Sequence, residues 1–160
     1  MKMIDVGAKP KTERVATARG NITMAPETVA RIVRGDVEKG DVLAACRIAG
    51  ILAAKHTPDI VPLCHPIALS NIEVSATPGP AGVEVVATVK TVDRTGVEME
   101  ALAAVSAALL TIYDMLKRYE HGMSIERVEL LKKDGGRTGL WLREKAAKPA
   151  AKAKAKGAKR

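Results

Sequence analysis

The stretch IALSNIEVSATPGPAGVEVVATVKTV, residues 67–92, contains two apolar patterns of period two on either side of a Pro/Gly-rich turn. The alternating apolar residues are Ile72, Val74, Ala76, Val83, Val85, Ala87 and Val89. An apolar side chain at every second position is typical of a strand that buries one face. The stretch therefore predicts an antiparallel hairpin, and the rest of the fold is built around it.

The longest predicted helix follows this hairpin, over residues 98–119. Its apolar residues recur at steps of three or four, as they do on the buried face of a helix. They are Leu102, Val105, Leu109, Ile112, Leu116 and Tyr119. Thr95 and Glu98 have the Thr-x-x-Glu spacing of a capping box at the start of this helix, and Gly122 follows its end.

Two further helices are predicted before the hairpin. Residues 26–34 begin with Pro26 and precede Gly35, which is the usual punctuation of a short helix. Residues 39–56 have Asp41 as a cap and apolar residues nearly all round, so this helix is expected to be buried. Strands are predicted at residues 14–24, 124–133 and 137–144. This order predicts an α+β sandwich, with helices on one face of a mainly antiparallel sheet.

A proline-rich loop joins the second helix to the hairpin. Residues 55–70, KHTPDIVPLCHPIALS, carry prolines at every fourth position, at Pro58, Pro62 and Pro66. Because proline lacks an amide hydrogen and biases the preceding residue toward extended geometry, no helix is expected here. The segment is interpreted as a rigid loop that presents Cys64 and His65.

The net charge of +8 is concentrated at one end of the chain. Residues 143–160 hold eight Lys or Arg and one Glu, which leaves 18 basic and 17 acidic residues in residues 1–142. The Ala/Lys-rich end is predicted to be a disordered tail that either improves solubility or contacts polyanions non-specifically. Aromatic residues make up 2% of the chain, which argues against a site that stacks single-stranded bases.

The length of 160 residues is sufficient for one globular domain, which we place at residues 1–142. Two cysteines, Cys46 and Cys64, form neither a disulfide framework nor a zinc-ligand pattern, so no metal site is predicted. Neither a signal peptide nor a run long enough to span a membrane is expected. A cytoplasmic protein with reduced thiols is therefore expected.

Two segments of the long helix carry candidate functional groups. In TGVEME, residues 95–100, the capping box leaves Met99 and Glu100 unexplained, and these residues could contact a ligand with a guanidine-like edge. Asp114 and Lys117 are either a surface ion pair or, in a cleft, a proton-transfer couple whose pKa values burial would shift toward useful ranges.

Helix geometry limits how these groups can act together. Glu100 and Asp114 are 14 residues apart, so they lie about 21 Å apart along the helix axis. The two side chains of one chain therefore cannot contact the same small reacting centre. Either only one of them is functional, or the site combines opposite ends of this helix from two subunits.

Other cations are less clearly placed by the sequence. Lys39 lies at a helix N-terminus, where free amides favour phosphate, although the pattern alone favours a plain solvated linker. Arg137 lies in the Gly-rich segment DGGRTG, for which a hairpin turn is the default. Arg14 and Lys55 have no assigned partner, and none of the common nucleotide-binding or nucleophile motifs is present.

Three stretches in order carry a more specific signal. They are KGDVLAACRIAGILAAKHTPDIVPLCHPIALS, TGVEMEALAAVSAALLTIYDMLK and LLKKDGGRTG. Together they resemble the cyclic pyranopterin monophosphate synthase family, also called molybdenum cofactor biosynthesis protein C, from about Asp5 to Trp141. The resemblance implies a ferredoxin-like α+β fold and a homohexamer, a trimer of dimers, with active sites at the dimer interface.

The reaction implied by this resemblance converts (8S)-3',8-cyclo-7,8-dihydroguanosine 5'-triphosphate into cyclic pyranopterin monophosphate and diphosphate, a phosphorus–oxygen lyase reaction. By similarity, Asp114 is the expected acid/base, with Lys117 and Lys39 in the same site. The residues expected by similarity to bind substrate are Leu63, Cys64, His65, Met99, Glu100, Glu98, Arg14 and Lys55. No cofactor is implied, although Mg²⁺ could accompany the triphosphate.

Three positions depart from the family pattern. Arg137 and Thr138 stand where Lys and Ser are expected, and Leu116 stands where a cysteine is frequent. Two competing hypotheses remain: a non-catalytic ferredoxin-like module that binds nucleic acid through its tail, and a related enzyme that uses plain GTP.

Overall fold

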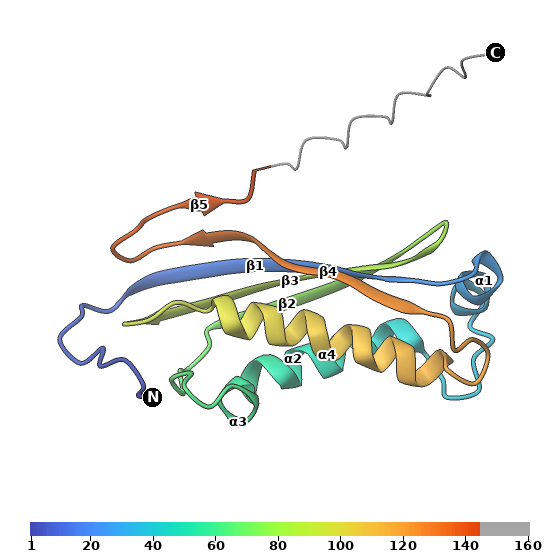
Figure 1. Ribbon diagram of the computed structural model, residues 1–160, viewed down its shortest axis with the longest axis horizontal. Coiled ribbons are helices and arrows are strands. Elements are labelled where there is room, and N and C mark those ends of the chain that lie inside the picture. Colours follow the sequence, from blue (N-terminus) through green and yellow to red (C-terminus); the bar gives the residue numbers. More distant parts are fainter. Residues whose placement is uncertain (145–160) are drawn as a thin grey trace, which may run out of the picture.

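The computed structural model describes residues 1–144 of the chain, and within them five strands form one antiparallel sheet in the order β2-β3-β1-β4-β5. The strands are β1 (Thr12–Thr23), β2 (Asn71–Gly79), β3 (Gly82–Asp93), β4 (Ser124–Asp134) and β5 (Trp141–Leu142). The helices are α1 (Pro26–Arg34), α2 (Val42–Lys55), α3 (Thr57–Ile60) and α4 (Glu98–Leu116). Helices α2 and α4 lie side by side on one face of the sheet (Figure 1). The predicted α+β, ferredoxin-like arrangement is confirmed.

The hairpin of residues 67–92 is confirmed as β2 and β3. Val74 pairs with Ala87 in its ladder, and the turn occupies residues 80–81. The buried side of the sheet is built by alternate residues of β1 and β3, namely Ala16, Ala18, Ile22, Val83, Val85, Ala87 and Val89. Both strands contact α4 on this side, which explains the period-two pattern by which the sequence identified β3.

Close packing of α4 on the sheet depends on Gly20 in β1. A Cβ atom at this position would lie 2.7 Å from Cδ1 of Leu109 and 2.9 Å from Cγ1 of Val105. Leu109 and Val105 belong to α4, and both are fully buried. The helix therefore rests directly on the glycine, and the core has no room for a methyl group there.

Gly20→Ala is expected to lower the free energy of unfolding by about 1–3 kcal/mol, because the added methyl group overpacks this contact. Urea denaturation followed by circular dichroism measures the change. Gly79→Ala is the matched control, since a Cβ atom there would have its nearest neighbour 3.9 Å away. Equal stability of the Gly20→Ala and Gly79→Ala proteins would contradict the packing described for α4.

The prediction that α2 is buried all round is wrong. Its buried residues, Val42, Cys46, Gly50 and Ala54, form a single stripe with a spacing of four. Ile48 and Leu52 lie on the outer side and are 59% and 51% exposed. Apolar content alone cannot show which side of a helix has a partner, and among the described residues the side of α2 that faces α4 and the sheet is the buried one.

The capping box predicted at the start of α4 does not form. Val97 occupies the N-cap position, and no side chain caps the helix. The end of α4 also differs, because the helix stops at Leu116 and not at residue 119. Thr95 and Glu98 are thus left free of a capping role.

Two further expectations on secondary structure need correction. Residues 57–60 form the single helical turn α3 despite Pro58, because proline is tolerated in the first turn of a helix. Strand β5 covers only residues 141–142, and Gly139, inside the predicted strand of residues 137–144, adopts a positive φ angle that interrupts it.

The sequence was not expected to contain a segment with the length and composition of a membrane span, but α4 has both. Half of the residues in its most apolar window are buried in the core. The apolar residues of α4 are therefore explained by the packing of this helix against the sheet and against α2.

The predicted basic tail begins at Arg143, which is bound to the sheet. Its backbone amide donates to the Leu131 carbonyl at 2.8 Å, and its Nε donates to the Leu130 carbonyl at 2.7 Å. The rest of the predicted tail, residues 145–160, lies outside the described residues.

Candidate active site

One group of candidate residues meets at the C-terminal end of α4 and is called here the Asp114 cluster. Lys39 lies on the loop before α2, and its Nζ donates to Oδ2 of Asp114 at 2.6 Å. Lys117, one residue past the last turn of α4, places its Nζ 2.7 Å from Oδ1 of the same carboxylate. Both oxygens of Asp114 are thus held by ammonium groups of the same chain.

Charge pairing, and not burial, sets the protonation of the Asp114 cluster. The side chain of Asp114 is 54% exposed. Hydrogen bonds from Lys117 and Lys39 lower the pKa of Asp114 to about 2, and the hydrogen bond to Asp114 raises the pKa of Lys117. Within one chain the two residues therefore form an exposed ion pair and not the buried couple whose pKa values would shift toward useful ranges, and Asp114 is present as a carboxylate.

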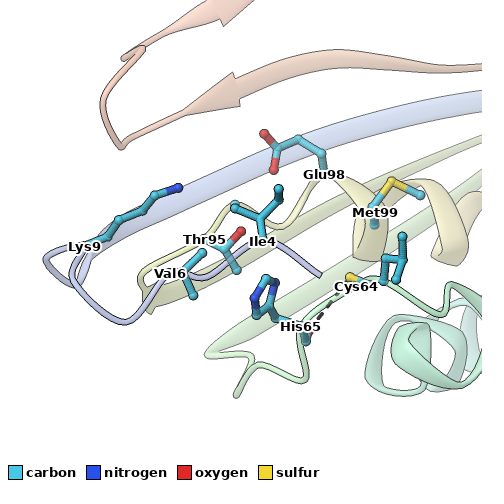
Figure 2. Close-up of a pocket in the computed structure, with 10 residues that line it drawn as sticks. Ile4, Val6, Lys9, Cys64, His65, Thr95, Glu98 and Met99 are labelled. Atoms are coloured by element: carbon cyan, nitrogen blue, oxygen red, sulfur yellow. Dashed lines mark hydrogen bonds between the residues drawn. The ribbon is translucent and has the colours of Figure 1, made fainter. Parts of the chain in front are cut away.

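A second group of candidates surrounds a cavity of about 410 Å³ at the other end of α4, called here the His65 pocket. Its lining residues are Ile4, Val6, Lys9, Leu63, Cys64, His65, Thr95, Gly96, Glu98 and Met99. Figure 2 shows that they come from three segments: the N-terminal segment, the proline-rich loop and the start of α4. The structure thus brings together Leu63, Cys64, His65, Glu98 and Met99 as one site.

Glu100 lies beneath this pocket and is only 1% exposed. The Cys64 thiol donates to its Oε1 at 3.5 Å, while Oε2 is buried without a hydrogen-bond partner among the described residues. Burial raises the pKa of Glu100. Direct contact between Glu100 and a ligand would require the Cys64 segment to move aside.

Cys64 is poorly suited to act as a nucleophile. Burial, followed by the neighbouring Glu100 carboxylate, raises its pKa from 9.0 to about 11. The reactive thiolate is therefore scarce at neutral pH. Cys64 is therefore better suited to a packing or backbone contact in the loop.

Alkylation of Cys64 by iodoacetamide at neutral pH is expected to be about a hundredfold slower than in the unfolded chain, because its pKa is raised from 9.0 to about 11. Mass spectrometry of the native protein and of the urea-unfolded protein measures the two rates. Glu100→Gln should speed the reaction, since it removes the neighbouring negative charge. Equal rates in native and unfolded protein would show that the thiol is not held as described.

A second cavity of about 620 Å³, called here the arginine pocket, adjoins the His65 pocket. Its lining residues are Lys9, Pro10, Thr12, Arg14, Arg94, Thr95, Gly96, Gly136, Arg137 and Thr138. Arg14 therefore lies at the His65 end of the molecule. Lys55 is the exposed last residue of α2, and no hydrogen bond or ion pair joins its side chain to a described residue.

The two groups of candidates remain separate within one chain. Glu100 and Asp114 belong to the same unbroken helix α4 and are 14 residues apart, which corresponds to about 21 Å. Lys39 and Asp114, in contrast, are 75 positions apart in sequence and in direct contact. One chain thus carries two separate groups of candidate residues, at opposite ends of its central helix, which are called half-sites below.

Sequence patterns had not singled out several residues of the site. Lys9 and Arg94 line the pockets but belong to irregular segments, where no periodicity marks a functional side. Ile4 and Val6 were missed for the same reason. Among residues 1–144, no group of three or more His, Cys, Asp or Glu side chains is arranged to hold a metal ion.

The chain is a ferredoxin-like α+β sandwich with a lysine-bound carboxylate at one end of α4 and a histidine-lined pocket at the other, and both groups are of the kind that can transfer protons. The sequence model of the MoaC family matches residues 3–136, and the chain belongs to this family.

Curated relatives cover most of the chain. A protein of Thermomicrobium roseum is 52% identical over 145 residues, which are 89% of this chain and 87% of that protein. A Roseiflexus protein is 55% identical over 86% of this chain and 89% of its own length, and one from Cereibacter sphaeroides is 55% identical over 86% and 87%. Each of the three is named cyclic pyranopterin monophosphate synthase.

Proposed function

We propose that this protein is a cyclic pyranopterin monophosphate synthase of molybdenum cofactor biosynthesis. It converts (8S)-3',8-cyclo-7,8-dihydroguanosine 5'-triphosphate into cyclic pyranopterin monophosphate and diphosphate. The observation that carries the proposal is the Asp114 carboxylate held at 2.6 and 2.7 Å by two lysines, in a chain at least 52% identical to synthases over most of its length.

The Asp114 cluster suits the proton transfers that such a ring rearrangement requires. Asp114 accepts a proton from the reacting substrate, and the ammonium groups of Lys39 and Lys117 stabilise negative charge that develops beside it. As substrate approaches, its own anionic groups compete with Asp114 for these two lysines. This competition frees the carboxylate for its role as a base.

The His65 pocket is the proposed binding site for the guanine-derived ring. The pocket is lined by His65, Leu63 and Met99, and Glu98 lies at its edge (Figure 2). The prolines of the loop fix its shape in advance, so that little conformational entropy is lost on binding. Arg14 and Lys55 are the proposed cations for the phosphates at this end.

A complete active site is proposed to need two subunits. The Asp114 cluster of one subunit and the His65 pocket of its partner would form one site, because the two half-sites of a single chain lie about 21 Å apart. A symmetric dimer would contain two such sites. The wider assembly that we propose is a homohexamer built as a trimer of dimers.

No resident cofactor is proposed, since the reaction requires acid/base groups and cations but no net oxidation. Mg²⁺ could enter with the triphosphate. We propose a cytoplasmic location, where the two cysteines stay reduced.

The proposal is tested by incubating the pure protein with the cyclised dihydroguanosine triphosphate, without nicotinamide or flavin, and following diphosphate and pterin together. We expect both products in equal amounts, and no pterin from plain GTP. Deleting residues 145–160 should leave turnover intact. Loss of function that depends on the tail alone would favour the competing nucleic-acid-binding module.

A further inference from the structure

We propose that Tyr119 is a positioning residue for the reaction, because its hydroxyl fixes the loop that brings Lys39 to Asp114. This inference rests on the proposed function, and it explains how one lysine of the Asp114 cluster reaches its carboxylate. Tyr119 was expected on the apolar side of the long helix. Since α4 ends at Leu116, Tyr119 lies instead three residues past the helix, where its side chain is free to serve the loop.

Lys39 belongs to a loop that regular structure does not hold. The loop, residues 35–41, joins α1 to α2 and contains neither helix nor strand. Gly35 and Gly40 have positive φ angles, and apart from chain neighbours no atom lies within 4 Å of the place of a Cβ atom at either glycine. Val37 is buried and anchors the first half of the loop, but Lys39 follows on an exposed turn. A second fixed point beside Lys39 lowers the entropy that this long side chain loses on binding one carboxylate.

Tyr119 supplies a fixed point directly beside Lys39. Its hydroxyl accepts a hydrogen bond from the backbone amide of Glu38 at 3.0 Å. On the next residue, the Lys39 ammonium donates to Oδ2 of Asp114 at 2.6 Å and to the Asp114 carbonyl at 3.0 Å. Two consecutive residues of the loop are therefore held by two residues at the C-terminal end of α4, which lies beside the loop (Figure 1).

The Tyr119 hydroxyl is itself fixed in place by contacts that do not involve the loop. The ring packs against the buried core, and the guanidinium carbon of Arg31 lies 4.8 Å from the ring centroid, an attractive arrangement. The next residue, Glu120, is bound to the start of α1, because its Oε2 accepts from the Ala25 amide at 3.0 Å and from the Thr28 hydroxyl at 2.6 Å. The hydroxyl is thus pre-organised to receive the loop amide.

Glu38 has a second contact with the same segment, an ion pair between its carboxylate and Arg118. Both side chains are exposed, and exposed pairs of this kind contribute little to the position of a chain. The ion pair also acts at the end of a flexible side chain, whereas the Tyr119 hydroxyl acts on the backbone itself. The contact of Tyr119 is therefore the one expected to set the position of Lys39.

The test compares Tyr119→Phe with the wild type, both as full-length assemblies. Phenylalanine keeps the ring and its packing and removes only the hydroxyl, so the fold should tolerate the change. Arg118→Gln is the first control, because it removes the other contact of Glu38. Tyr113→Phe is the second control, because it removes a hydroxyl that donates to the His121 carbonyl at 3.1 Å, at the same end of α4 but away from the loop.

The first readout does not depend on turnover. It is the rate at which N-hydroxysuccinimidyl acetate acylates Lys39, followed by peptide mass spectrometry. An ammonium group that is bound to a carboxylate must leave it and lose a proton before its nitrogen can attack the ester. In Tyr119→Phe, Lys39 should react about three to ten times faster, the factor expected for one lost hydrogen bond. Lys117 binds the same carboxylate from outside the loop, so its rate should stay that of the wild type.

The second readout is steady-state kinetics with the cyclised substrate. The turnover number of Tyr119→Phe should fall about three- to tenfold, because Lys39 spends less time where negative charge develops. KM should stay within about twofold of the wild type, since the His65 pocket is unchanged. Arg118→Gln and Tyr113→Phe should match the wild type in both readouts. General damage to the fold would instead change the acylation of Lys117 as well as that of Lys39.

The two readouts separate this inference from the proposed function. If the wild type makes both products, the inference is overturned by unchanged acylation of Lys39 in Tyr119→Phe, or by faster acylation with an unchanged turnover number. A larger effect of Arg118→Gln than of Tyr119→Phe would overturn it as well, because the ion pair would then hold the loop. If Lys39 reacts faster in Tyr119→Phe but the wild type forms no product, the proposed function fails, and the role of Tyr119 in turnover fails with it.

Discussion

Replacing Asp114 by asparagine is expected to lower the turnover number by about 10²–10⁴-fold, the range associated with loss of a general acid/base group. The amide keeps the shape of the side chain and can still accept a hydrogen bond, but it cannot take up a proton. Since Lys39 and Lys117 hold the pKa of Asp114 near 2, the carboxylate is ionised throughout the mildly acidic and neutral range. The loss should therefore be similar across that range.

Product formation in single-turnover and steady-state assays measures this effect, with circular dichroism and size-exclusion chromatography to establish that the fold and assembly are intact. Asp36→Asn is the matched control, because Asp36 also pairs with a cation but lies outside both half-sites. An Asp114→Asn protein with the turnover number of the wild type would remove Asp114 from the mechanism.

Subunit complementation is expected to produce the other large effect. The Asp114→Asn protein lacks one half-site and a His65→Ala protein lacks the other, so each assembly alone should be nearly inactive. In a mixed dimer one of the two sites combines an intact Asp114 cluster with an intact His65 pocket. Random mixing should restore about a quarter of wild-type activity, because half of the dimers are mixed and each has one intact site.

The choice of partner variant depends on the contact between Lys39 and Asp114. Because both side chains belong to the same cluster of one chain, mixing Lys39→Ala with Asp114→Asn leaves every site with a damaged cluster. That pair should show no recovery and serves as the negative control. Because the two residues are 75 positions apart in sequence, the sequence does not show that they share one cluster. Without the structure, this pair would therefore look suitable for complementation.

The predictions that succeeded relied on local periodicity. Alternation identified β2 and β3, and steps of three or four identified α4, because these patterns describe how one element buries one side. Asp41 was correctly placed as a cap, with its carboxylate accepting from the Ala44 amide at 2.9 Å. The three quoted stretches also carried enough specific residues to indicate the family.

The predictions that failed needed information from outside a local window. Apolar residues on both sides of α2 suggested full burial, but a pattern cannot show that Ile48 and Leu52 are left exposed by residues 1–144. The predicted capping box is absent because Val97, and not Thr95, occupies the N-cap position of α4. The Thr-x-x-Glu spacing also occurs at many places where no helix is capped. Lys9 and Arg94 became visible only when the fold brought irregular segments around a common cavity.

The central claim is that opposite ends of α4, from two subunits, build one active site. Coexpressing Asp114→Asn and His65→Ala chains with different affinity tags, purifying the doubly tagged assembly and measuring its turnover tests this claim most directly. We predict activity far above that of either variant alone, with none regained in the Lys39→Ala and Asp114→Asn mixture. A doubly tagged assembly no more active than its parents, beside an active doubly tagged wild type, would contradict the shared site.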